Sequence, residues 1–429
     1  MNPCECGGQE HVTRRAFLKG TIVGAGGLAV GNWGSFFNSE SIAQEARKQG
    51  KKCILLWMAG GASHLDTFDM KPGRAISGPF RPIGTNVAGI QVCEYLPRIA
   101  KQADKLAIIR SMSTSDPDHV GGTYMMHTGY RKEAATTHPE IGAMVAKYLG
   151  NPDADLPSFI QVGWIGSTSS PAAGGGFLGP LYHPFRMGME GGMPPDTTPY
   201  LQGDADLRRN ELLKALDEDF IREHHAQAIK AYREADEKSR RLLKAKAAFD
   251  ISRDWEKHKD LYGNSAFGKN CLMARKLVEA GVPFVEVQQN DYDWHANNFE
   301  GHKTLLPVLD HGWAGLLQDL HQRGLLQDTL VVWMGEFGRT PAINQRAGRD
   351  HYTKAWTVVL SGGGVKGGVV YGATDEDGRN VTDKQISQTD LFATIYTALG
   401  INPRAKHTLG IRPIWATPED ARVIRDLLV

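Results

Sequence analysis

The chain has 429 residues, enough for one large α/β domain or two smaller ones. Its 49 Lys and Arg residues nearly cancel its 48 Asp and Glu residues, so the charge balance predicts no nucleic-acid partner. A hydrophobic content of 41% is ordinary for a globular protein with a substantial core.

The first 46 residues have the pattern of an export signal. An arginine pair lies in the sequence TRRAFLK at residues 13–19, and an apolar, glycine-rich stretch follows at residues 20–37. Small residues at Ala43 and Ala46 would permit cleavage. The pattern predicts a twin-arginine signal and a periplasmic or otherwise extracytoplasmic protein. The alternative is an uncleaved anchor, but the apolar run is short for a membrane span, so no stable span is expected after signal removal.

Five cysteines are present, and they do not form a regular pattern. Cys4 and Cys6 would leave with the signal, while Cys53, Cys93 and Cys271 are an odd and scattered set. No disulfide framework is expected, although the protein is predicted to be exported.

The first strand expected in the mature chain covers residues 53–59 and ends in two glycines. A polar loop follows with Ser63, His64 and Asp66. Members of a catalytic triad usually come from separated segments, so these three neighbours are not expected to form one. Asp66 is instead predicted to be a metal ligand or a substrate contact.

A second polar cluster follows the strand expected at residues 106–110. Asp118 and His119 lie near the start of a helix that is expected to reach about residue 129. The helix dipole favours an anion at this end, so both residues are candidates to serve the reacting group. The alternative for Asp118 is a helix N-cap.

The middle of the chain changes character twice. A short strand is expected at residues 159–162, and residues 163–203 are rich in Gly, Pro and Ser without periodicity. A stretch of that length in a compact domain is usually functional or mobile. Residues 204–262 contain no Gly or Pro and are dense in charge, which predicts an inserted long helix or helical hairpin with a solvated face.

Another polar cluster follows the buried strand expected at residues 283–288. Asp293 and His295 are two residues apart, a pattern typical of half a metal site, although a solvated loop is the alternative. An amphipathic helix is expected at residues 305–320, with Asp310 on its surface.

The stretch from residue 329 to residue 352 combines a buried strand with an acidic loop. Residues 329–334 have the pattern of a central parallel strand, and Glu336 follows at once on a glycine-flanked turn. Asp350 and His351 come later in the same loop and suit a metal ion. Alternatively, Glu336 pairs with Arg339, and Asp350 orients His351 or caps a turn.

A strand at residues 356–360 and a capped helix at residues 389–399 complete the pattern. Strands recur with helices between them, and several strand ends carry Asp, Glu or His. The sequence therefore predicts one α/β domain over residues 51–429. We expect a three-layer α/β/α sandwich with a doubly wound, mostly parallel sheet and one composite polar site at its rim.

Several motifs resemble known families. LPRIA, MMHTG, TLVVWMGEFG and DLFATI follow the order and spacing of sulfatases, which belong to the alkaline phosphatase superfamily. More closely, LWMAGGASHLDTFDMKP, HVGGTYMMHTG, DWHANN and GEFGRTP resemble the bacterial family catalogued as domain of unknown function 1501. Many members of that family carry twin-arginine signals. The resemblance covers nearly the whole mature chain and implies an alkaline phosphatase-like fold and hydrolysis of sulfate or phosphate esters.

The resemblance also implies positions for the site. Glu336 falls where sulfatases have a metal-binding Asp, and Phe337 where they have Asn or His. Gly60 and Gly61 fall where sulfatases have a first Asp pair, and His119 falls where the formylglycine-forming Cys would be.

A second set of positions resembles the phosphatases. Asp293, His295 and His351 match their additional Asp and His ligands, whereas Thr123 stands where the sulfatase motif has Arg. Formylglycine maturation from cysteine is therefore not expected.

Two hypotheses follow. The first is an exported, metal-dependent hydrolase of a small-molecule or glycan ester of sulfate or phosphate, in which Asp118 and His119 serve the reacting group. Zinc, calcium, magnesium and manganese all remain candidates for its metal, and the predicted ligands are Asp66, Asp293, His295, Glu336, Asp350 and His351. The second hypothesis is an inactive sulfatase-like scaffold that binds an envelope glycan or a partner protein.

Overall fold

The computed structural model describes residues 47–48, 50–163, 173–188, 203–224, 233, 240–242, 245–409 and 412–429. The predicted twin-arginine signal therefore lies outside the described residues, as does much of the Gly- and Pro-rich stretch. None of the helices in the described ranges combines the length and the hydropathy that a membrane span requires.

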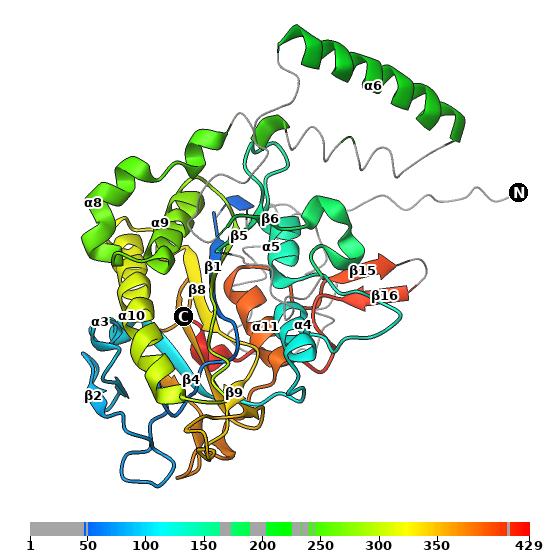
Figure 1. Ribbon diagram of the computed structural model, residues 1–429. Coiled ribbons are helices and arrows are strands. Elements are labelled where there is room, and N and C mark those ends of the chain that lie inside the picture. The colour runs from blue at the N-terminus through cyan, green and yellow to red at the C-terminus, as the bar shows by residue number, and fades with distance from the viewer. Residues whose placement is uncertain are drawn as a thin grey trace, which may run out of the picture. The chain divides into compact units, whose positions relative to one another are not determined.

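An eight-stranded sheet forms the centre of the fold (Figure 1). Its spatial order is β12 (Val369–Tyr371), β4 (Leu106–Met112), β11 (Trp356–Gly362), β8 (Thr329–Met334), β1 (Lys52–Met58), β7 (Phe284–Gln289), β5 (Phe159–Val162) and β6 (Phe185–Arg186). Neighbouring strands pair in parallel except at β11, which runs antiparallel to both β4 and β8. The predicted mostly parallel sheet is confirmed.

Helices cover both faces of this sheet (Figure 1). One face carries α3 (Pro97–Ala100), α8 (Ser252–Tyr262), α9 (Ala266–Glu279) and α10 (Asn298–Gln322). The other carries α4 (His119–Thr128), α5 (Ile141–Leu149) and α11 (Gln388–Ala398). The predicted α/β/α sandwich is therefore confirmed.

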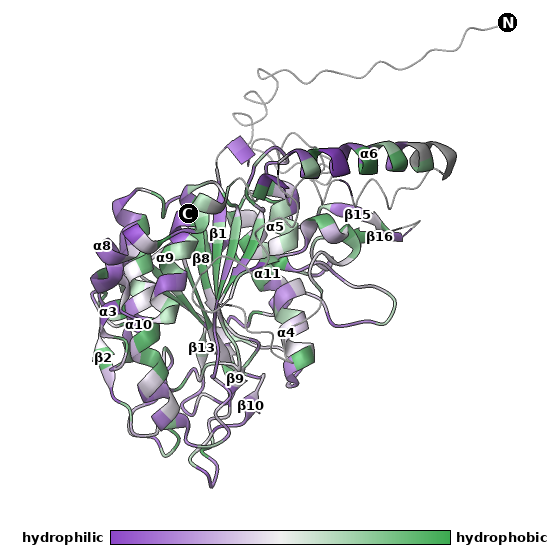
Figure 2. Ribbon diagram, turned by 45° about the horizontal axis from the view of Figure 1, so that its top comes forward, coloured by the Kyte–Doolittle hydropathy of each residue, from purple (hydrophilic) through white to green (hydrophobic). Residues whose placement is uncertain are grey.

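Alternation along the strands explains why the sheet has two cores. In β1, Ile54 and Leu56 belong to the core under α9 and α10, whereas Leu55 and Trp57 belong to the core under α5 and α11. Successive side chains of a strand point to opposite faces, so a continuous apolar run fills both sides. Burying each large apolar side chain contributes about 1.5–3 kcal/mol, and Figure 2 shows the hydrophobic central strands between the two helical layers.

The fold has further elements, one long helix and several short strands. They are β2 (Pro82–Gly84), β3 (Gln91–Cys93), α6 (Asp204–His224), β9 (Gly338–Arg339), β10 (His351–Tyr352), β13 (Ala373–Thr374), β14 (Val381–Asp383), β15 (Lys406–Leu409) and β16 (Arg412–Trp415). The expected insertion at residues 204–262 contains at least two separate helices, α6 and α8.

The structure differs from the sequence pattern at several elements. Helix α5 and the edge strand β6 were not predicted from the sequence. Strand β6 leaves no sequence signal, because it is only two residues long and is defined by its pairing with β5. Helix α10 starts seven residues earlier than the predicted 305. Asp310 is buried, not exposed, because its carboxylate accepts the Arg98 and Ile99 backbone N–H groups at the start of α3.

A buried polar network holds the far end of α4. His127 Nε2 lies 3.5 Å from Glu286 Oε2 on β7, and Gln161 on β5 donates to the same oxygen at 3.1 Å. Burial disfavours a charged imidazole, yet the Glu286 carboxylate outweighs it and raises the pKa of His127 to about 9. Burial raises the pKa of Glu140 to about 7, against the opposing effect of His127. The core beneath α4 therefore binds protons that an unfolded chain would release.

We expect Glu140 to make the protein less stable as pH rises from about 4.5 to about 7. Its pKa is raised from 4.5 to about 7 in the folded state, so its stabilising contribution is complete below the unfolded pKa and lost as pH approaches 7. Relative to Glu140→Gln, which cannot titrate, the wild type should lose on the order of 2 kcal/mol across this range. Urea unfolding at several pH values measures the difference, and parallel profiles for the two proteins would contradict it.

Candidate metal centre

Three adjacent strands bring the predicted polar residues to one rim of the sheet. In the order β8, β1, β7, the chain continues from their carboxyl ends into Glu336, Gly60 and Asp293 respectively. Helix α4 begins with His119 and strand β10 begins with His351, and both side chains contact Asp293. Loops after neighbouring parallel strands meet at one edge, which is where open α/β sheets bind ligands.

The Asp293 carboxylate lies at the centre of this group. Its Oδ1 is 3.1 Å from His295 Nε2 and 3.1 Å from His351 Nε2, and the two Nε2 atoms are 3.0 Å apart. Its Oδ2 is 3.1 Å from His119 Nε2. These side chains are partly exposed, with Asp293 at 43%. Three ligand atoms thus form a nearly equilateral triangle that is open to solvent.

The Nδ1 atoms of His295 and His351 each lie within hydrogen-bond distance of an oxygen atom. His351 Nδ1 lies 2.6 Å from the Pro117 carbonyl oxygen, and His295 Nδ1 lies 2.6 Å from Asp350 Oδ1. The proton of each neutral ring is therefore assigned to Nδ1, and the Nε2 atom carries a lone pair. Two such lone pairs and the Asp293 oxygen would face one another at hydrogen-bond distance. Such an arrangement favours a cation between its members, either a proton or a metal ion.

His119 has a similar arrangement on the other side of Asp293. Its Nδ1 lies 2.8 Å from Glu336 Oε1, which also accepts the Gly60 N–H at 2.9 Å. The bonds to Asp293 and then to Glu336 raise the pKa of His119 to about 9. Glu336 is 1% exposed, and its Oε2 has no hydrogen-bond partner among the described residues. Glu336 therefore stands behind His119 rather than in the triangle.

A buried arginine holds the Asp293 carboxylate in place. Arg339 is 0% exposed, and its Nη2 donates to Asp293 Oδ1 at 2.6 Å and also to the Gly60 carbonyl. Its Nε donates to the Gly61 carbonyl at 3.0 Å. Against the effect of burial, hydrogen bonds from His119, His351 and Arg339 hold the pKa of Asp293 far below its usual value. Arg339 thus pairs with Asp293, not with Glu336 as the alternative interpretation had it.

The glycine pair after β1 is required by this packing. Gly60 and Gly61 have φ values of +108° and +81°. A Cβ on Gly60 would collide with the backbone nitrogen of Asp293, and one on Gly61 would lie 2.5 Å from the Phe337 carbonyl oxygen. The positions where the resemblance expects an Asp pair are therefore too close to neighbouring backbone for any side chain.

Two predicted site residues have other partners. Asp66 is buried and forms a bidentate ion pair with Arg349, at 2.8 and 3.2 Å, while Asn298 donates to it at 3.0 Å. Asp118 accepts the Val120 N–H at 2.9 Å and so caps α4. Asp66 thus neutralises a buried guanidinium, and Asp118 closes a helix end.

The sequence pattern missed two contributors to the centre, Arg339 as the partner of Asp293 and the carbonyl of Pro117. Arg339 is visible in the GEFGRTP motif, but the motif does not tell which acid it contacts. A backbone carbonyl leaves no signal in a sequence.

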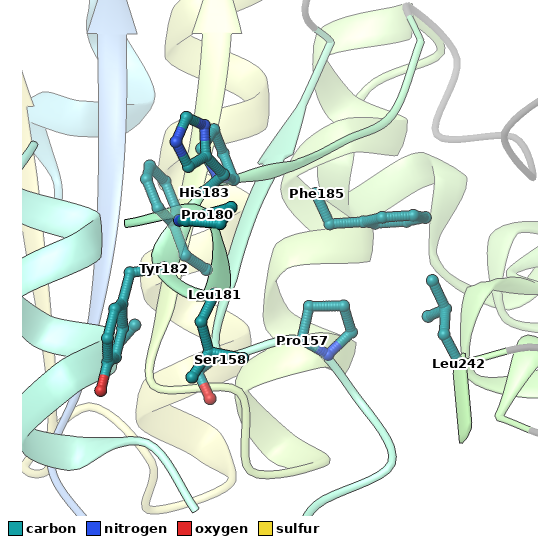
Figure 3. Close-up of a pocket in the computed structure, with 11 residues that line it drawn as sticks. Pro157, Ser158, Pro180, Leu181, Tyr182, His183, Phe185 and Leu242 are labelled. Atoms are coloured by element: carbon teal, nitrogen blue, oxygen red, sulfur yellow. The ribbon is translucent and has the colours of Figure 1, made fainter. Parts of the chain in front are cut away.

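A hollow lies at the rim of the sheet opposite the histidine cluster. A pocket of about 220 Å³ is lined by residues that precede or begin β5 and β6, together with Ala146 and Leu242 (Figure 3). Pro157 and Ser158 lead into β5, and His183 leads into β6. The pocket therefore lies at the amino ends of these strands, away from the histidine cluster.

These features define the class of protein as an α/β protein with an imidazole- and carboxylate-lined centre at the carboxyl rim of its sheet. The family model described as Protein of unknown function (DUF1501) matches residues 50–428, and the chain belongs to this family. Among curated proteins, none matches the chain.

Solved structures of low sequence identity resemble the chain. The alkaline phosphatase from the Antarctic bacterium TAB5 is 13% identical, covers 82% of this chain and 98% of its own, and has a TM-score of 0.37. The C-terminal periplasmic domain of EcEptC from Escherichia coli, in complex with Zn, is 10% identical. The match covers 88% of this chain and 95% of that domain, with a TM-score of 0.39. The PsFucS1 sulfatase from Pseudoalteromonas sp. is 14% identical. The match covers 84% of this chain and 71% of the sulfatase, with a TM-score of 0.35.

We expect Gly61→Ala to cost much more stability than Gly73→Ala. Both glycines have φ of +81°, but a Cβ at Gly73 meets nothing within 4 Å. Gly73→Ala should cost about 1–2 kcal/mol for the left-handed backbone alone. Gly61→Ala should cost a further ~2 kcal/mol, because the Phe337 backbone must move. Urea unfolding of both variants measures the costs, and equal values would contradict the close approach.

Proposed function

We propose that the protein is an exported, metal-dependent hydrolase of sulfate or phosphate esters. The observation that carries the proposal is the triangle of Asp293 Oδ1, His295 Nε2 and His351 Nε2, whose edges are 3.0–3.1 Å. The outer hydrogen bonds of both rings direct their lone pairs toward the position that a shared cation would occupy. Ligating histidines in metalloproteins are oriented in the same way by acceptors on the other ring nitrogen.

The donor set selects among the candidate metals. Two imidazoles and one carboxylate suit zinc or a neighbouring transition metal. Calcium and magnesium prefer oxygen ligands alone. We therefore propose zinc, or a metal of similar preference, held by Asp293, His295 and His351. A divalent ion held there would act as a Lewis acid toward an ester oxygen.

The remaining residues have distinct parts in the proposed reaction. His119 faces the centre through Nε2 and is the candidate to accept or deliver a proton at that atom. Glu336 fixes the proton on His119 Nδ1 and is a positioning residue. Asp350 orients His295, and Arg339 fixes Asp293 so that both carboxylate oxygens face imidazoles.

Export completes the proposal. The arginine pair at residues 14–15 and the apolar stretch after it support transport by the twin-arginine route. That route carries folded proteins, so a metal could be bound before export. The substrate would then be an extracytoplasmic ester, either a small molecule or a glycan.

One observation favours a second candidate function, a scaffold that binds a glycan or a partner protein. Arg339 is the guanidinium in contact with Asp293, and it is fully buried with each nitrogen committed to a protein oxygen. It cannot reach an anionic ester. A metal-loaded protein that binds a glycan but hydrolyses none of a broad panel of sulfate and phosphate esters would establish this candidate instead.

We expect the purified protein to bind about one equivalent of zinc. His295→Ala and His351→Ala each remove a proposed ligand and should weaken zinc binding at least about tenfold. His311→Ala is the control, because its ring contacts the Asp260 carbonyl on another part of the fold. Elemental analysis and chelator competition measure stoichiometry and affinity. Less than about a tenth of an equivalent, with no uptake on titration, would defeat the proposal.

We expect Glu336→Gln to lower turnover without removing the metal. The amide oxygen can still accept from Gly60 and His119, but the negative charge that stabilises a protonated His119 is lost. Loss of such a supporting group typically costs about 10–100-fold in activity. Ester hydrolysis and zinc affinity are measured on the same preparation. Unchanged turnover would show that His119 is not the proton-transfer group.

A further inference from the structure

We infer that an apolar stripe on helix α6 is a self-association surface, on which two copies of the chain pack antiparallel along this helix. The stripe is formed by Leu212, Leu213, Leu216 and Phe220. None of these residues belongs to the metal centre, so the inference is independent of the proposed function.

Exposed apolar side chains are concentrated on α6. Among the described residues, ten large apolar side chains are exposed, and five of them lie on this one helix. Leu212 and Leu216 are 62% and 58% exposed, and helical spacing places Leu213 and Phe220 on the same side. Single exposed leucines are common, but a contiguous apolar patch marks an interaction surface.

The chain segment that follows α6 binds another side of the helix. Arg233 Nε lies 2.9 Å from Asp217 Oδ2, and Arg240 Nη1 lies 2.8 Å from Asp206 Oδ2. Asp206 and Asp217 share one flank of α6, which lies about 90° around the helix from Leu216. These ion pairs therefore hold the segment beside the apolar stripe and leave the stripe itself exposed.

The order of charges along α6 favours a second copy of the same helix. Arg208 and Arg209 are exposed near its start, and positions 219 and 223 on the same side near its end are acidic in the sequence. An antiparallel pair would place the arginines of each copy beside the acids of the other, whereas a parallel pair would bring like charges together. A two-fold arrangement therefore matches the apolar stripe and the charges at both ends.

The stripe also defines the register of this pair. Leu212 lies four residues before Leu216, and Phe220 lies four residues after it. A two-fold axis at Leu216 would set Leu212 of each copy against Phe220 of the other and bring the two Leu216 side chains together. In the same register Arg209 would face position 223, because each is seven residues from the axis.

A lipid surface is the other occupant that an amphipathic helix can have, and the charge of α6 disfavours it. Residues 204–224 contain seven Asp and Glu residues against four Lys and Arg residues. Helices that lie on bilayers are rich in Lys and Arg on their polar face, and anionic headgroups repel an acidic helix. A second copy is therefore the occupant that fits both the apolar stripe and its flanking charges.

Sedimentation of the full-length protein over a range of concentrations tests the inference. We expect a reversible monomer–dimer equilibrium with a Kd on the order of 10 µM, since one helix of 21 residues offers only a small interface. Leu212→Gln together with Leu216→Gln should raise this Kd at least about tenfold, because both copies lose the centre of the stripe.

Leu207→Gln is the matched control. Leu207 lies on the same helix and is 61% exposed, but it is nine residues from Leu216. That separation is about two and a half turns, so Leu207 lies on the opposite side of α6. This variant should dimerise as the wild type does.

Single cysteines test the antiparallel register. Leu216→Cys puts a thiol on the proposed two-fold axis, so mild oxidation should link two copies. Leu212→Cys should not link them, because the two substituted positions would be about 12 Å apart along the helix axis. The three described cysteines are buried, and both N-terminal cysteines are replaced by serine in these variants.

The outcomes decide between the two occupants. A protein that stays monomeric up to about 100 µM would overturn the inference, and so would equal cross-linking at positions 212 and 216. Flotation with vesicles of phosphatidylethanolamine and phosphatidylglycerol tests the lipid alternative. Vesicle binding that the double glutamine variant abolishes, in a protein that does not self-associate, would assign the stripe to a membrane instead.

Discussion

The ion pair between Arg339 and Asp293 is the contact on which the centre depends. The guanidinium joins the loops that follow three strands, because Arg339 itself follows β8 and it bonds the carbonyls after β1 and the carboxylate after β7. A buried arginine without an acid would be strongly destabilising, and without the arginine the carboxylate would lose its one buried cationic partner among the described residues. The pair therefore makes the position of Asp293 a property of the fold, and the imidazoles are arranged around a fixed acceptor.

Much of the framework follows from the sequence because it depends on local patterns. The runs that became β1, β5, β7 and β8 are short, apolar and bounded by turn residues, and their observed limits differ little from the expected ones. The meeting of Asp293, His295 and His351 also follows, since the carboxyl ends of adjacent parallel strands share a rim. Neither step needs knowledge of a specific long-range contact.

Other features depend on contacts that no local pattern specifies. Asp66 and Asp293 both follow a strand, yet Asp66 pairs with Arg349 in the core while Asp293 faces the open rim. The difference arises from which backbone approaches which, and the glycine pair after β1 decides that approach. The hydrogen bond from His351 to a backbone carbonyl is equally invisible in a sequence. The sequence thus predicts which side chains form the centre, but not the buried side chains and backbone carbonyls that hold them in place.

The reversed direction of β11 has a consequence for how the centre is assembled. A connection between adjacent antiparallel strands returns at the edge where it left, whereas a parallel neighbour requires a crossover to the far edge. The chain from β8 to β11 therefore never leaves the rim, and Glu336, Arg339, Asp350 and His351 all lie on this single excursion. Four residues at or behind the centre therefore come from one connection between two neighbouring strands, and the chain places them at the rim without crossing the sheet.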